Sequence, residues 1–218
     1  MCKTKFCLML LLGVLLCAPV SIGAESVDAL LQRAWSAYNT GRYQESIKIV
    51  QPLASDGNPI AQVILGRCYE NGTGVPQNLT QAAEWYQLAA EQNNAQAMVR
   101  LAYCYELGAG VPKDTAKTLE LMQKAAEAGQ AEAQHNLALY YNKGQYGLNR
   151  DHKKSFDWAL KSAKQGFGRA EQLVGAFYEF GIGTSPNAAL AKEWFAKAEA
   201  KGLVRDDVIK TIHALPMN

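Results

Sequence analysis

The sequence predicts an all-α solenoid built from helix–turn–helix repeats. A pattern of small, aliphatic and aromatic residues recurs from Ala61 onward at a stride of 36 or 37 residues. Within each period the residues have the spacing of one face of an α-helix. Each period also holds a pair of glycines followed by Asn or Asp, which are signals for the end of one helix and the start of the next.

The first 24 residues are expected to be a signal peptide. Two lysines open the segment, an apolar run follows at residues 6–16, and Ala24 ends it with a small side chain. This order is typical of a secretory leader cleaved after Ala24, and the run is too short to span a membrane. Cys17 raises the alternative of a lipoprotein, but the bulky Leu16 stands where lipidation needs a small residue. We therefore expect a periplasmic or secreted protein of a Gram-negative bacterium.

The charge balance argues against a nucleic-acid partner. Lys3 and Lys5 are the only charged residues before Glu25, so removing them from the formal net charge of +2 leaves a neutral chain. Electrostatic binding to nucleic acid needs a basic excess. After Ala24 no apolar run approaches the length of a membrane span.

The first helix of each repeat is predicted from four columns of residues. A small residue opens the repeat, an aliphatic residue follows four positions later, a second small residue comes next, and a tyrosine closes the stripe at i+8. This spacing lies on one helix face. The columns are Ala61, Ala97, Ala133 and Ala170; Leu65, Leu101, Leu137 and Val174; Gly66, Ala102, Ala138 and Gly175; and Tyr69, Tyr105, Tyr141 and Tyr178.

A Gly-x-Gly turn joins the two helices of each repeat. Such a sequence can also cradle a phosphate at a helix N-terminus. A phosphate loop occurs once per site, whereas this turn recurs at a fixed stride, which favours helix punctuation. The columns are Gly72, Gly108, Gly144 and Gly181; then Gly74, Gly110, Gly147 and Gly183; then the expected N-caps Asn78, Asp114, Asp151 and Asn187.

The second helix carries a bulky column that could be read as an aromatic ligand box. Its regular position favours packing in the core, against the first helix of the following repeat. That column is Trp85, Leu121, Trp158 and Trp194, and the small residues four positions on are Ala89, Ala125, Ser162 and Ala198. The repeats close at Asn93, Gly129, Gly166 and Gly202. These limits predict four units at residues 58–93, 94–129, 130–166 and 167–202.

Two further segments flank the repeats. Residues 25–57 contain a tighter helix–turn–helix. Residues 203–218 place Val204, Val208, Ile212 and Leu215 on one helical face before Pro216. A solenoid needs its last open face covered, so we expect a C-terminal capping helix.

The repeat resembles a known family. The segment "AQVILGRCYENGTGVPQNLTQAAEWYQLAAEQNN", residues 61–94, is similar to the Sel-one-like repeat (SLR), and the three later units resemble it with more substitutions. The segment from Tyr38 to Leu53 looks more like a tetratricopeptide (TPR) unit. The resemblance covers nearly all of the chain after Ala24 and implies a right-handed α/α superhelix of the TPR/SLR type. It is specific for fold and weak for function.

The resemblance also suggests an enzymatic alternative, because similar proteins have been described as β-lactamase-like. That chemistry uses Ser-x-x-Lys, Ser-Asp-Asn and Lys-Thr-Gly elements, and the sequence contains none of them. His135, His152 and His213 are scattered, with no metal-ligand spacing. We therefore expect no catalytic site, no cofactor and no metal, and keep a cell-wall or β-lactam enzyme as the alternative.

Tetratricopeptide-like solenoids bind partners along the concave surface lined by the first helix of each repeat. By that resemblance, the lining positions lie at −2, +2, +5 and +6 from the aliphatic column. These columns vary between repeats, although plain solvated surface is the other reading. They are Val63, Arg67, Glu70 and Asn71; Val99, Tyr103, Glu106 and Leu107; His135, Leu139, Asn142 and Lys143; and Gln172, Ala176, Glu179 and Phe180.

The expected function is a non-enzymatic, exported, monomeric scaffold that binds a protein or peptide in this concave groove. Envelope regulation, assembly of envelope machinery, toxin immunity and host-protein binding remain open as roles.

Two cysteines follow the leader, and an exported protein could join them in a disulfide. Cys68 and Cys104 occupy the same column of adjacent repeats. Residues related by a near-translation have parallel Cα–Cβ vectors and lie roughly 8–10 Å apart, whereas a disulfide needs convergent vectors within about 7 Å. We therefore predict two free, slow-reacting thiols.

Overall fold

The computed structural model describes residues 25–205, which form ten α-helices and no β-strand. The all-α prediction is therefore confirmed for this part of the chain. The predicted signal peptide and residues 206–218 of the predicted capping helix lie outside the described residues. The helices are α1 (Val27–Asn39), α2 (Tyr43–Ser55), α3 (Pro59–Asn71), α4 (Leu79–Glu91), α5 (Ala95–Leu107), α6 (Thr115–Glu127), α7 (Ala131–Lys143), α8 (His152–Lys164), α9 (Gly168–Phe180) and α10 (Ala188–Glu199).

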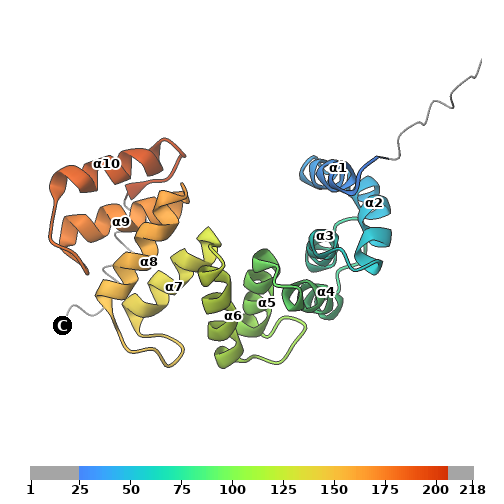
Figure 1. Cartoon of the computed structure of the whole chain (residues 1–218), viewed down its shortest axis with the longest axis horizontal. Helices are drawn as coiled ribbons and strands as arrows, with labels where there is room; N and C mark the ends of the chain where they lie inside the picture. Colours follow the sequence, from blue (N-terminus) through green and yellow to red (C-terminus); the bar gives the residue numbers. More distant parts are fainter. Residues whose placement is uncertain (1–24, 206–218) are drawn as a thin grey trace, which may run out of the picture.

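The helices form a solenoid. Each helix packs mainly against the helices before and after it in sequence, and α1 also touches α3. Figure 1 shows the helix pairs following one another along an arc, with α1 and α10 at its two ends. Because contacts are mostly between neighbours, each repeat is stabilised by its own hairpin and by the repeats on either side.

The predicted helix caps are confirmed. The side chains of Asn78, Asp114, Asp151 and Asn187 each accept a hydrogen bond from the backbone N–H three residues on, at 2.9–3.1 Å. The first glycine of each turn is left-handed and ends the preceding helix, as Gly72 does with a φ of 67°. The recurring Gly-x-Gly is therefore helix punctuation.

The second glycine of the turn allows the loop to lie close to the preceding repeat. A Cβ added at Gly110 would lie 2.1 Å from the carbonyl oxygen of Leu79, and one at Gly183 would lie 2.0 Å from that of His152. Gly147, in the repeat with one extra loop residue, has no such neighbour within 4 Å.

The core follows the predicted columns on the first helix of each repeat. The opening alanines are fully buried, and the aliphatic column that follows is at most 2% exposed. The four tyrosines at i+8 are only half-buried and pack on the edge of the core clusters.

The tryptophans were expected in the core, but they are only partly buried. Trp85, Trp158 and Trp194 are half-buried. The Nζ atoms of Lys161 and Lys197 lie 3.9 and 4.0 Å from the ring centroids of Trp158 and Trp194. The deeply buried column is the next residue, because the tryptophans stand at the edge of the apolar stripe of the helix. That column is Tyr86, Met122, Ala159 and Phe195.

A polar pair joins the two helices inside three of the repeats. Gln92 Nε2 donates to Gln62 Oε1 at 3.0 Å, and Gln165 Nε2 donates to Gln134 Oε1 at 2.8 Å. In the last repeat an ion pair replaces the amides, with Lys201 Nζ 2.6 Å from Glu171 Oε1. The buried side chains of Gln62, Gln134 and Glu171 are thus each paired with a polar partner.

Candidate protein-binding face

The structure divides the predicted lining residues into two groups by exposure. Six of them are buried and lie beneath the face instead of on it: Val63, Val99, His135, Asn142, Gln172 and Ala176. The accessible ones are Arg67, Glu70, Asn71, Tyr103, Glu106, Leu107, Leu139, Lys143, Glu179 and Phe180. That this face binds a protein stays a prediction.

Arg67, on α3, is held by two aromatic rings of α1. Its guanidinium carbon lies 5.0 Å from the ring centroid of Trp35 and 5.0 Å from that of Tyr38. The two rings are themselves stacked, with centroids 5.8 Å apart. Asn71 Nδ2 donates to the hydroxyl of Tyr38 at 2.8 Å, which fixes that ring. A planar cation stacked in this way is held in place while its edge keeps donors free.

Tyrosine hydroxyls donate to three glutamates near this face. The Tyr86 hydroxyl lies 2.5 Å from Glu70 Oε2, and the Tyr103 hydroxyl lies 2.9 Å from Glu132 Oε1. A third bond joins Tyr146 to Glu106. Burial and the adjacent carboxylate raise the pKa of Tyr103 to about 12, so this hydroxyl remains a donor at neutral pH.

The side chain of Arg100, on α5, has no hydrogen-bond partner of this kind in the described part of the chain. This side chain forms no hydrogen bond or ion pair among residues 25–205, and its Nε is buried without an acceptor. The charges of Arg100 and Glu70 both act on Tyr86 and Cys104. A buried donor without a partner is costly, so Arg100 is a candidate for contact with a ligand.

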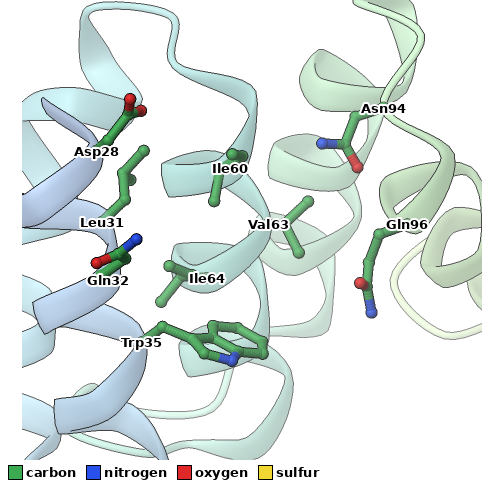
Figure 2. Close-up of a pocket in the computed structure, with 9 residues that line it drawn as sticks. All are labelled: Asp28, Leu31, Gln32, Trp35, Ile60, Val63, Ile64, Asn94 and Gln96. Atoms are coloured by element: carbon green, nitrogen blue, oxygen red, sulfur yellow. The ribbon is translucent and has the colours of Figure 1, made fainter.

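A groove of about 580 Å³ opens between α1, α3 and the start of α5. Figure 2 shows its apolar floor, with Trp35 and Asp28 at opposite ends. Ile60 is 50% exposed there, although it is a large aliphatic side chain. The lining residues are Asp28, Leu31, Gln32, Trp35, Ile60, Val63, Ile64, Asn94 and Gln96.

Of these lining residues, the sequence had pointed only to Val63. Four of the others lie on α1, which is outside the repeat register from which the face was counted. The remaining four, Ile60, Ile64, Asn94 and Gln96, belong to the repeats but do not occupy the positions that were counted.

The histidines do not converge on a reactive site within the described residues. His135 is buried against Phe167, with ring centroids 5.4 Å apart, and its Nδ1 has no partner. Burial, aided by the charge of Arg169, lowers the pKa of His135 to about 4. His152 Nδ1 lies 2.9 Å from the side-chain oxygen of buried Asn142.

No group of three or more His, Cys, Asp or Glu side chains among residues 25–205 could hold a metal ion. No helix in that range is both long and apolar enough to cross a bilayer.

Both cysteines are free and buried in the structure, as the repeat geometry predicts. Burial raises the pKa of each thiol to about 11. Because the thiolate is the reactive form, both thiols are poor nucleophiles in the folded protein.

Residues 59–94, 95–130, 131–167 and 168–203 each match the Sel1 repeat. The chain is 32% identical over 190 residues to chitin synthase regulatory factor 3 of Schizosaccharomyces pombe, an alignment that covers 84% of this chain and 16% of that protein. This chain thus spans less than a fifth of the curated relatives that it matches.

Two solved structures share the fold. A Sel1 repeat protein from Oxalobacter formigenes is 28% identical with a TM-score of 0.73, over 82% of this chain and 74% of that one. A protective antigen of uropathogenic Escherichia coli, c5321, is 30% identical with a TM-score of 0.69, over 82% of this chain and 39% of that one.

Proposed function

Because the chain belongs to the Sel1 repeat family, whose members are generally protein-interaction scaffolds, we propose that it is an exported, non-enzymatic scaffold that binds a partner protein or peptide. Docking takes place on the face formed by α1 and by the first helix of each repeat. The observation that carries this proposal is the apolar groove beside Trp35 and Ile60. Exposed aliphatic side chains in a preformed groove favour binding because their burial releases water.

The class of partner follows from charge and shape. The chain after Ala24 is formally neutral, which favours a protein over nucleic acid. The face mixes aromatic, aliphatic and charged side chains, as protein interfaces do. The protein acts as a monomer in this proposal. Regulation of the envelope, assembly of envelope machinery, toxin immunity and host-protein binding are the roles open to it.

Capture with matched variants tests the proposal. Ile60 and Leu88 are exposed aliphatic residues, 50% and 44% exposed, but Ile60 lines the groove and Leu88 lies on α4 outside it. We expect Ile60→Asp to lose a protein that the unaltered chain captures from envelope extract, and Leu88→Asp to retain it. Equal capture by both variants would place the binding surface elsewhere.

Export is tested separately. The sequence of residues 1–24 supports a cleaved leader. Protein recovered from the periplasm or the medium should begin at Glu25 by N-terminal sequencing. Protein that stays in the cytoplasm with Met1 intact would refute this part of the proposal.

The alternative is an enzyme acting on cell-wall or β-lactam substrates. Turnover of a chromogenic β-lactam distinguishes the two, and the scaffold proposal expects no hydrolysis above that of buffer.

A further inference from the structure

Two arginines, Arg67 and Arg100, stand one helical turn beyond residues that line the groove, and the groove together with these arginines is called the track. Leu31, Val63 and Gln96 line the groove from three different helices. Four residues further along the same helices stand Trp35, Arg67 and Arg100. One helical turn rises 5.4 Å and returns the side chain to nearly the same face. The apolar groove is therefore bordered at one end by two cations on neighbouring helices.

At this end of the track, within the described part of the chain, the carboxylates have hydrogen-bond partners and the arginine side chains do not. The nearby carboxylates of Glu70 and Glu132 already accept tyrosine hydroxyls. Among residues 25–205, the side chains of Arg67 and Arg100 form no ion pair and no hydrogen bond. The donors of the two guanidinium groups are thus not engaged by these carboxylates, and a partner that supplied carboxylates would give them acceptors.

The stacking of Arg67 on two rings also reduces the conformational entropy that is lost on binding. The guanidinium of Arg67 lies over the rings of Trp35 and Tyr38, so less side-chain freedom is lost when its edge meets a carboxylate. Arg100, which is only partly buried, would gain a charged partner for its guanidinium group. At the other end of the groove Asp28 supplies the opposite charge, which disfavours a segment that is acidic along its whole length.

We infer that the track binds an acidic–apolar segment of a partner protein, with one bulky apolar side chain seated in the groove against Trp35 and Ile60, and with adjacent carboxylates on Arg67 and Arg100. This inference rests on the proposed function and specifies the chemistry of the partner.

The test uses synthetic peptides with a central Leu or Phe, flanked on one side by two Asp, two Lys or two Ser. Binding to the full chain is measured by fluorescence polarisation at low and high salt. The Asp peptides should bind, and their affinity should fall as salt rises. Arg67→Gln and Arg100→Gln should each weaken them about tenfold or more, as expected for a lost charge-assisted bond. Arg150→Gln, which removes an exposed cation outside the track, should leave binding unchanged.

Several results would overturn the inference. Equal binding of the Lys or Ser peptides, binding that survives both arginine variants, or no binding of any peptide would each do so. Such failures leave the proposed function standing if capture still depends on Ile60. If polygalacturonate competes and needs the same arginines, the occupant is an anionic polysaccharide. If a peptide of residues 206–218, which opens with Asp206 and Asp207, binds best, the occupant is a second copy of this chain.

Discussion

Gly66 lies directly against the ring of Tyr86, so closely that a Cβ at Gly66 would be 2.6 Å from Cε1 of that ring. The same relationship joins Gly175 to Phe195, at 2.9 Å. In the second repeat the equivalent positions hold Ala102 and Met122. Small and large side chains thus complement each other where the two helices of a repeat cross, as close packing requires.

This complementarity predicts a coupled effect on stability. Gly66→Ala should lower the free energy of unfolding by about 1–3 kcal/mol, because the buried ring of Tyr86 cannot move aside without strain. In a Tyr86→Met background the same change should cost less, as the pairing of Ala102 with Met122 indicates. Urea unfolding of the four proteins in this double-mutant cycle measures the coupling. Additive effects would show that the ring is not what excludes the methyl group.

The turn glycines give a second prediction, with an internal control. Gly110 and Gly147 both have positive φ, at 75° and 81°, so alanine carries a similar backbone cost at each. Only Gly110 also faces the carbonyl of Leu79. Gly110→Ala should therefore destabilise the chain by at least about 1 kcal/mol more than Gly147→Ala, measured by thermal and urea unfolding. Similar losses at both sites would mean that the loop does not hold the repeats together.

Much of the fold could be predicted from the sequence because its signals are local. A cap such as Asp114 and a left-handed glycine such as Gly72 act within a few residues of their own position, and they recur. The buried columns follow from helical periodicity in the same way.

The depth of the tryptophans and the contents of the face could not be predicted in this way. Whether Trp85 or Tyr86 is deeper depends on which neighbouring helix covers the edge of the stripe. The bond between Tyr103 and Glu132 spans two repeats, and the groove needs α1, which has no counterpart in the repeat register. These contacts depend on how the helices stack, and that is not encoded in any single repeat.

His135 predicts a dependence of stability on pH. Its folded pKa is about 4, below the ordinary 6.5, so between these values the unfolded chain binds a proton that the folded chain does not. Stability should therefore be complete above about pH 6.5 and fall as the pH drops toward 4, by at most roughly 3 kcal/mol from this group.

His135→Leu should remove that slope, and His152→Ala should keep it. The measurement is urea unfolding at a series of pH values. A slope that survives in His135→Leu would assign the effect to other groups.

The buried thiols predict slow chemistry in the native state. Cys68 and Cys104 should react with a thiol reagent far more slowly in the folded protein than in urea, because burial raises the pKa of both to about 11. Mass spectrometry of unreduced, denatured and alkylated protein should find two adducts. A mass two hydrogens lighter, with no adduct, would reveal a disulfide.

The most direct test of the account is photo-crosslinking in living cells. A photoreactive amino acid is placed at position 60, in the groove, or at position 88, on the outer surface of α4. We predict a discrete protein adduct from position 60, degraded by protease, and none from position 88. An adduct from position 88 alone, or from neither position, would contradict the claim that this protein works by docking a partner in the groove beside Trp35.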